Sequence, residues 1–146
     1  MFISLKAYKG SIASFAAFAA LALGVAAGPV AAQPEQAAGE LRTSVDQGVT
    51  VKVTPKTLGP ADARWEFSVV FDTHSAQLND DVAQTTVLVT DDGRTLKPVA
   101  WTGAGPGGHH REGVLAFEAA VPRPVSIELK MTRPGESAAR SFRWKL

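Results

Sequence analysis

The sequence predicts an all-β protein, an immunoglobulin-like antiparallel β-sandwich of about seven strands. Beyond residue 48, apolar and polar side chains alternate with a period of two in almost every segment, which is typical of half-buried strands. Turns that contain proline or glycine separate these segments at the spacing expected for such a sandwich. No apolar stripe with helical periodicity follows the first 32 residues, and the absence of cysteine excludes the Cys-Trp-Cys pattern of antibody domains.

Six segments carry the strand pattern clearly, and a seventh carries it weakly. The clear segments are 49–53, 65–71, 86–90, 114–117, 125–131 and 142–146, and the weak one lies near 96–101. The Asp92-Gly93 pair suits a two-residue hairpin turn. A short helical turn is expected over 79–84, with Asn79 or Asp80 as its N-cap.

One side of this alternation defines the expected core. Its members are Val49, Val51, Val53, Trp65, Phe67, Val69, Phe71, Leu115, Phe117, Val125, Ile127, Leu129, Phe142 and Trp144. Trp101 stands beside a glycine-rich loop, where it either caps a binding site or plugs the end of the sandwich. The plug is favoured because buried aromatic side chains dominate protein cores.

The first residues predict a signal peptide over 1–32 and a periplasmic or secreted protein. Lys6 and Lys9 precede an apolar stretch, and small residues stand at Val30 and Ala32, which is the pattern of a cleavage site after Ala32. An uncleaved anchor is the alternative, although the stretch is short and rich in alanine for a membrane span of about 20 residues. A flexible tether is expected over 33–47, followed by the sandwich domain over 48–146.

Charge argues against two classes of partner. Two of the 15 basic residues lie in the signal peptide and none of the 14 acidic residues does, so cleavage leaves 13 basic residues and a formal charge of −1. A nearly neutral chain without a basic run predicts no nucleic-acid partner and no binding to anionic membrane surfaces. After cleavage no other apolar run is long enough to span a bilayer.

The run from Gly103 to Gly113 holds five of the 13 glycines and two of the three histidines, and it is the strongest candidate for a functional loop. Tandem glycines lose conformational entropy unless the backbone needs positive φ or close approach to another group. Asp72 and His74 point off the core face by parity and lie on one side of their strand, so either His109 or His110 could reach them. Imidazole and carboxylate groups are ligands for zinc and copper(II), which predicts a divalent transition-metal site.

Two other interpretations of these residues compete with metal binding. Asp72 is either a ligand or a partner that orients a histidine, and the histidines are either ligands or parts of a structural polar network. Ser75, His74 and Asp72 lie too close in sequence to form a hydrolytic relay, so no catalytic residue and no enzymatic activity are expected. Acid pairs in turns, such as Asp91-Asp92, are interpreted as solvated or capping residues.

The middle of the chain resembles a group of secreted bacterial and archaeal β-sandwich proteins that have no established activity. The resemblance covers about 51–144 and is carried by 69–81, by 98–101 and above all by the Gly-Gly-His-His-Arg block of 107–111. It implies that Asp72, His74, His109, His110 and Arg111 form a common site, and it implies no particular ligand. A looser likeness to periplasmic copper carriers stops at the architecture, since the only methionine after the signal, Met131, is at an inward position.

The sequence therefore supports two hypotheses about function. The first is an exported, non-catalytic domain that binds copper or zinc through His74, His109 or His110, with Asp72 beside them and Arg111 balancing charge. The second is a recognition module for a glycan or a cell-envelope protein, in which Trp101 and Arg111 make the contact and the histidines are structural.

Overall fold

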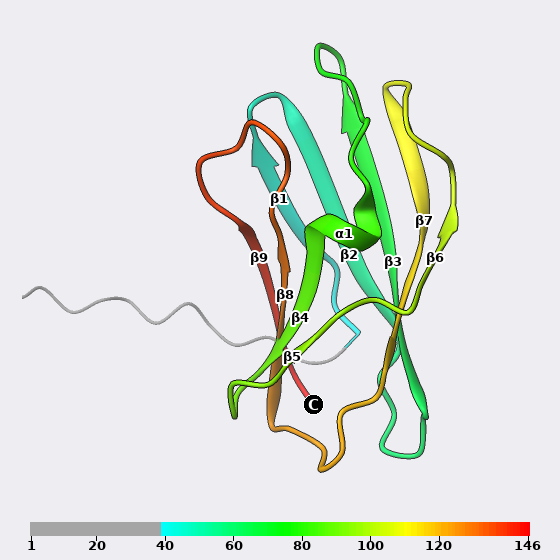
Figure 1. Ribbon diagram of the computed structural model, residues 1–146, viewed down its shortest axis with the longest axis vertical. Coiled ribbons are helices and arrows are strands. Elements are labelled where there is room, and N and C mark those ends of the chain that lie inside the picture. Colours follow the sequence, from blue (N-terminus) through cyan, green and yellow to red (C-terminus); the bar gives the residue numbers. More distant parts are fainter. Residues whose placement is uncertain (1–38) are drawn as a thin grey trace, which may run out of the picture. The chain divides into compact units, whose positions relative to one another are not determined.

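The computed structural model describes residues 39–146, which form two antiparallel sheets packed as a sandwich (Figure 1). The predicted all-β sandwich is confirmed. One sheet has the order β1-β2-β3-β7-β6 and the other the order β5-β4-β8-β9. The strands are β1 Arg42–Asp46, β2 Val49–Thr57, β3 Arg64–Thr73, β4 Thr86–Thr90, β5 Thr95–Leu96, β6 Ala100–Gly103, β7 His110–Glu118, β8 Ser126–Met131 and β9 Arg140–Lys145, and one short helix, α1 Val82–Thr85, precedes β4.

The core between the sheets contains the inward residues expected from the period of two, with one exception. Val125 is 69% exposed, so its assignment to the core was wrong. β8 begins one residue later, at Ser126, and the backbone N–H of Val125 donates at 2.9 Å to Oδ1 of Asp91, which lies in the hairpin between β4 and β5. Leu78, Val82 and Leu88 are core residues that the alternation did not identify.

The strand count rises from the expected seven to nine for two reasons. The weak segment near 96–101 divides into β5 and β6, which belong to different sheets, so the chain crosses the sandwich between them. In addition, residues 42–46 of the expected tether form β1, which pairs with β2 from Arg42↔Val53 to Asp46↔Val49. The tether boundary at 47 was therefore wrong, because a polar edge strand lacks the apolar alternation that marks the other strands.

Arginine side chains hold the edge strand β1 against β9 of the opposite sheet. Arg42 Nε donates to the carbonyl of Arg143 at 3.0 Å, and Arg140 Nη1 donates to the carbonyl of Ser44 at 3.0 Å. This edge of the sandwich is consequently closed by hydrogen bonds between side chain and backbone.

Both predicted turns exist, but neither has the predicted boundaries. The hairpin between β4 and β5 has a loop of three residues, 91–93, and not the expected two: the N–H of Thr90 donates to the Arg94 carbonyl at 3.0 Å, and Gly93, with φ +85°, donates from its N–H to the Thr90 carbonyl at 2.9 Å. The helical turn exists, but it begins at Val82 and its N-cap is Asp81, whose Oδ1 accepts from the N–H of Gln84 at 3.2 Å. The expected caps, Asn79 and Asp80, therefore lie before the helix, and Asp80 is buried in the domain.

Four connections gather at one end of the sandwich, which we call the loop end. They are the β1–β2 turn, the segment 74–81, the β6–β7 loop 104–109 and the β8–β9 loop 132–139. Gln47 Nε2 donates to the Gly135 carbonyl at 3.1 Å, and the N–H of Gly107 donates to the Leu78 carbonyl at 2.9 Å. Within residues 39–146, no helix is both long and apolar enough to cross a membrane. The predicted signal peptide and residues 33–38 of the predicted tether lie outside the described residues.

Candidate functional site

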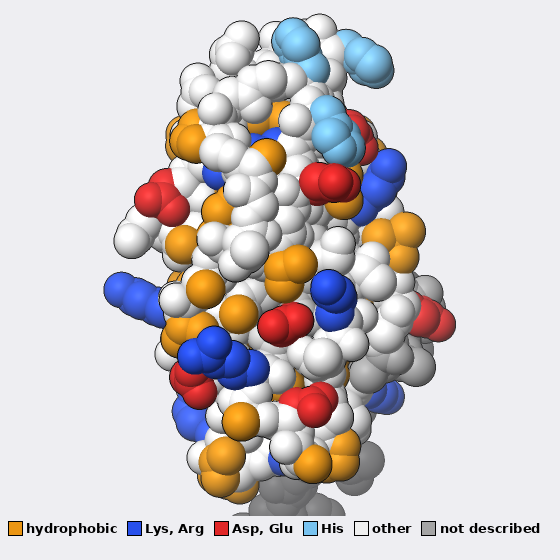
Figure 2. All heavy atoms as spheres, turned by 90° about the vertical axis from the view of Figure 1, so that its right-hand side faces the viewer, with side chains coloured by type: hydrophobic (Ala, Val, Ile, Leu, Met, Phe, Trp, Pro, Cys, Tyr) orange, Lys and Arg blue, Asp and Glu red, His pale blue; other side chains and the backbone are white. Residues whose placement is uncertain are grey.

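The structure brings Asp72 and His110 together on the outer face of the five-stranded sheet. The two residues are directly opposite one another where β3 ends and β7 begins. Glu112 follows two residues after His110 on the same face of β7, and Lys52 reaches the pair from β2. Figure 2 shows histidine side chains gathered at one end of the molecule, next to acidic and basic groups. We call Lys52, Asp72, His110 and Glu112 the histidine cluster.

Short polar contacts link the members of this cluster in a row across three strands. His110 Nδ1 lies 2.6 Å from Asp72 Oδ1, and Lys52 Nζ lies 3.3 Å from Asp72 Oδ2. On the other side of the ring, His110 Nε2 lies 3.7 Å from Glu112 Oε2. An ionised carboxylate can only accept a hydrogen bond, so Nδ1 carries a proton and Nε2 faces the second carboxylate.

The contacts move the pKa values of both partners in the direction that favours their charged forms. The hydrogen bond from His110 lowers the pKa of Asp72 below its ordinary 3.8; partial burial opposes this, and Lys52 adds to it. The hydrogen bond to Asp72 raises the pKa of His110 above 6.5, and the charges of Asp72 and Glu112 act in the same direction. Both shifts therefore favour the ion pair between a cationic His110 ring and the Asp72 carboxylate.

This arrangement predicts a measurable change in the titration of His110. In Asp72→Asn the accepting oxygen stays but its charge is lost, so the pKa of His110 should fall toward about 6.5. Since the pKa of His110 is raised by folding, the pair stabilises the fold below the ordinary histidine pKa, and this contribution disappears as pH rises through the raised value. NMR titration of the ring protons measures the shift, and an unchanged His110 pKa in the variant would show that the pair does not form in solution.

The other two histidines lie at the loop end without joining the cluster. His74 follows the end of β3 and is exposed. His109 is also exposed, and it is its backbone carbonyl that accepts a hydrogen bond, at 2.9 Å, from the N–H of Thr73. Residues 39–146 contain no group of three or more His, Asp or Glu side chains that could hold a metal ion together. The expected common site thus reduces to Asp72 and His110, to which the structure adds Glu112 and Lys52.

Backbone geometry explains most of the glycines in the β6–β7 loop and in the strands beside it. Gly103 and Gly113 are paired across the two strands, and a Cβ on Gly113 would lie 2.6 Å from the Trp101 ring and 2.8 Å from the Cα of Gly103. Gly107 and Gly108 have φ of +112° and +76°, where glycine is favoured. Close approach and left-handed geometry therefore account for four of the five glycines.

Arg111 and Trp101, the expected binding residues, face the inside of the domain. Arg111 is only 3% exposed. Its Nε donates to the Ala104 carbonyl at 2.9 Å, and its Nη1 donates to the carbonyls of Asp80 at 2.6 Å and Leu78 at 3.3 Å. Trp101 packs partly buried against the core, donates from Nε1 to the Ala104 carbonyl at 3.1 Å and lies with its ring centroid 5.5 Å from the Arg111 guanidinium. Arg111 thus joins the glycine-rich loop to the segment before α1, and Trp101 supports the loop through Ala104 and the Arg111 guanidinium.

A buried ionic network at the loop end was not anticipated. Arg133 forms a bidentate ion pair with Asp80, in which Nη2 and Oδ1 are 3.1 Å apart, and its Nη1 lies 3.1 Å from Glu136 Oε1. Arg140 Nη2 reaches the same Glu136 oxygen at 2.6 Å. Burial raises the pKa of Glu136, but Arg140 and Arg133 outweigh it, so the net shift is downward. These four side chains, which are 93% or more buried, constitute what we call the arginine network.

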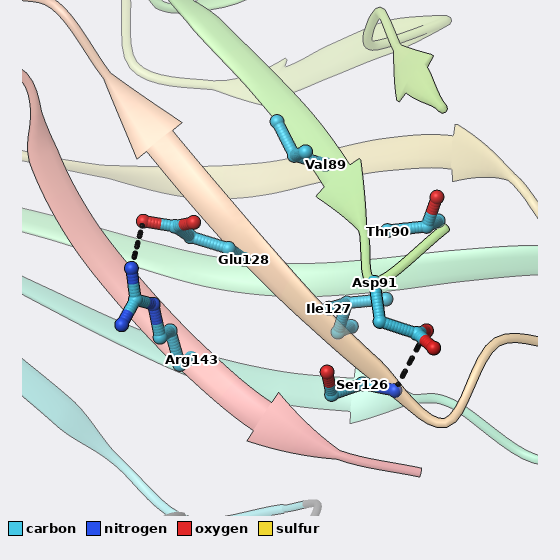
Figure 3. A pocket seen from close by; sticks show the side chains of 7 residues that line it. All are labelled: Val89, Thr90, Asp91, Ser126, Ile127, Glu128 and Arg143. Atoms are coloured by element: carbon cyan, nitrogen blue, oxygen red, sulfur yellow. Dashed lines mark hydrogen bonds and ion pairs between the residues drawn. The ribbon is translucent and has the colours of Figure 1, made fainter. Parts of the chain in front are cut away.

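The four-stranded sheet carries a separate hollow of about 200 Å³ (Figure 3). Its charged groups already have partners: Arg143 Nη2 lies 3.1 Å from Glu128 Oε1, and Asp91 Oδ1 accepts from the N–H of Ser126 at 3.1 Å. Burial raises the pKa of Glu128, yet hydrogen bonds from Ser141 and Arg143 bring it below 4.5 overall. These residues tie β4, β8 and β9 together, and we assign them a structural role.

Comparison with known proteins identifies no relative. No family model, no curated protein and no solved structure matches the chain. Function is therefore argued from the geometry of the histidine cluster and the loop end.

Proposed function

We propose that this chain is an exported, non-catalytic domain that binds a divalent transition metal, zinc or copper(II), at the histidine cluster. The ligands are His110 Nε2 and Glu112 Oε2. Asp72 is not a ligand in this proposal; it holds the ring from behind through Nδ1. The observation that carries the proposal is the contact between Asp72 Oδ1 and His110 Nδ1 at 2.6 Å, which directs the second ring nitrogen toward a carboxylate.

Distance and chemistry support this ligand pair. Zinc bonds imidazole nitrogen and carboxylate oxygen at about 2.0–2.2 Å. His110 Nε2 and Glu112 Oε2 are 3.7 Å apart, so one ion between them can reach both without a change in backbone. Metal-bound histidines commonly donate their other N–H to a carboxylate, which is the role given to Asp72. Both zinc and copper(II) accept this combination of nitrogen and oxygen.

Charge supports the binding of a cation in the same place. Without metal, the site favours a protonated ring between Asp72 and Glu112. A divalent ion replaces the proton on Nε2, so binding releases a proton and weakens as pH falls through the raised pKa of His110. Two protein ligands leave the remaining positions to water, which makes the ion exchangeable and suits a carrier or an accessory module.

Calorimetric titration of the tag-free protein with zinc and with copper(II) tests the proposal. We expect one equivalent to bind more tightly than roughly 1 mM, or about −4 kcal/mol, and to bind more weakly at pH 5.5 than at pH 7.5. A polyhistidine tag must be absent because it binds both ions. Absence of binding at this level in the wild-type protein would refute the metal site.

Variants of the three histidines separate this ligand set from the broader one expected from sequence. His110→Ala should abolish binding, Glu112→Gln should weaken it at least about tenfold, and His74→Ala and His109→Ala should leave it unchanged. The last two are matched controls, since each removes an exposed imidazole at the same end of the domain. Loss of binding in His74→Ala with retention in His110→Ala would assign the metal to other ligands and contradict the proposal.

A further inference from the structure

A second candidate site is a polar pocket of about 290 Å³ at the loop end, distinct in its residues from the histidine cluster. It is bounded by the β1–β2 turn, the segment before α1 and the β8–β9 loop. Three amide side chains, Gln47, Gln77 and Asn79, line it together with the charged groups of Asp80, Arg133 and Glu136. No residue of the histidine cluster lines this pocket.

The charged lining belongs to the arginine network, which has no net charge when Arg140, behind the pocket wall, is counted with it. Asp80 and Glu136 are balanced by Arg133, which lies in the pocket wall, and by Arg140, which bonds to Glu136. Arg133 has five N–H groups, and its contacts with Asp80 and Glu136 use three of them. The pocket therefore offers a neutral ligand the remaining N–H donors of Arg133, and the charges in its wall are compensated within the arginine network.

The amides add groups that both donate and accept hydrogen bonds. Gln77 and Asn79 are exposed, and their side chains form no hydrogen bond with any residue of 39–146. Gln47 donates from Nε2 to the Gly135 carbonyl, which leaves its own carbonyl oxygen without a partner in the described part of the chain. These three side chains can pair with hydroxyl groups, which likewise donate and accept.

The backbone at Gln47 gives independent support for a role of its side chain. Gln47 has φ +44° and Gly48 has φ +74°, so the two form a left-handed two-residue turn between β1 and β2. The first position of such a turn is usually Asn, Asp or Gly, because these residues tolerate positive φ. Any other residue at positive φ is strained, and the surrounding structure has to hold it in place. The turn itself does not require glutamine, and the longer side chain of Gln47 places its amide group in the wall of the pocket.

We propose that this pocket binds a single neutral sugar unit, either free or at the end of a glycan. Its hydroxyls would pair with the amides and with the remaining N–H groups of Arg133, and the C–H face of the ring would lie on Ala76 and Pro134. The volume, about 290 Å³, lies just below the range for drug-sized ligand pockets, about 300–1,000 Å³, which fits one ring and not a chain.

Ligand-observed and protein-observed NMR with the tag-free full chain test this inference, using glucose, galactose and N-acetylglucosamine as probes in the presence of EDTA. At least one probe should bind with a Kd of about 1–10 mM and shift the signals of the Gln47 and Gln77 side chains. The methyl glycoside of that probe separates the two sources. Equal binding indicates the end of a glycan, and loss of binding indicates a free sugar.

Two substitutions and one control make the result specific. Gln47→Asn retains the preference for the left-handed turn, so the melting temperature should stay the same or rise while binding falls at least about tenfold. Gln77→Ala changes an exposed side chain and should weaken binding to a similar degree. Gln84→Ala, an exposed glutamine on α1 that does not line the pocket, should have no effect. The inference is overturned if no probe saturates below 100 mM, or if both pocket variants bind as the wild type does.

Discussion

Replacing Arg133 with alanine should lower the free energy of unfolding by about 3–5 kcal/mol. The substitution removes the cation that pairs with Asp80 and contacts Glu136, while Asp80 stays 7% exposed and loses its charged partner. Removing one member of a buried ion pair is more damaging than removing both, because the remaining charge has been taken out of water without compensation. Urea unfolding at neutral pH gives the change directly.

Two comparisons make the Arg133 result interpretable. Arg64 pairs with Glu118 at 3.3 Å on the surface, so Arg64→Ala should cost no more than about 1 kcal/mol. Arg133→Met combined with Asp80→Leu removes both charges, and it should be more stable than Arg133→Met alone. A loss below about 1 kcal/mol in Arg133→Ala would mean that Asp80 is hydrated in solution and that the arginine network is not buried as described.

Replacing Trp144 with alanine should have an effect of similar size, about 3–5 kcal/mol. Trp144 on β9 is completely buried, and its ring centroid lies 5.4 Å from that of Phe67 on β3 in the opposite sheet. Its Nε1 also donates to the Glu40 carbonyl at 2.7 Å, which fastens the chain ahead of β1. Alanine leaves a cavity between the sheets and removes this bond, and thermal and urea unfolding both report the loss.

Trp144→Phe is the matched control for the cavity. It keeps an aromatic ring against Phe67 and loses the hydrogen bond to Glu40, so its effect should be clearly smaller than that of alanine. Equal losses in the two variants would attribute the stability to the hydrogen bond and not to packing between the sheets.

The core was predictable from sequence because each strand obeys a period of two by itself. Thirteen of the fourteen expected inward residues are buried, and this set needs no knowledge of which strands pair. Val125 failed because parity does not show where a strand begins. The edge strand β1 was missed because four of its five side chains are polar and its one apolar side chain, Val45, is 70% exposed.

The same parity points to the arginines of the loop end. Each arginine has the same parity as an inward apolar residue near it, and all three arginines are buried. The pairs are Arg111 with Leu115, Arg133 with Met131, and Arg140 with Phe142. Extending the inward stripe beyond its apolar members would have identified them. Their partners were beyond reach, since Asp80 and Arg133 are 53 residues apart and meet only through tertiary folding.

The histidine cluster was predictable in part for a related reason. The outward direction of Asp72 followed from its strand, and either His109 or His110 was expected to reach it. The choice of His110 over His109 depends on the β3–β7 register, which joins residues 38 positions apart. Glu112 has the same parity as His110 on β7, so the pattern of that strand alone contained the second proposed ligand.

NMR observation of the histidine side chains during zinc titration tests the central claim most directly. With tag-free protein labelled with ¹⁵N, the three imidazoles are resolved and each ring nitrogen is followed separately. We predict that the Nε2 signal of His110 shifts on binding, that its Nδ1 stays protonated against Asp72, and that His74 and His109 do not respond. A response from His74 or His109 with no change at His110 would contradict the proposed metal site.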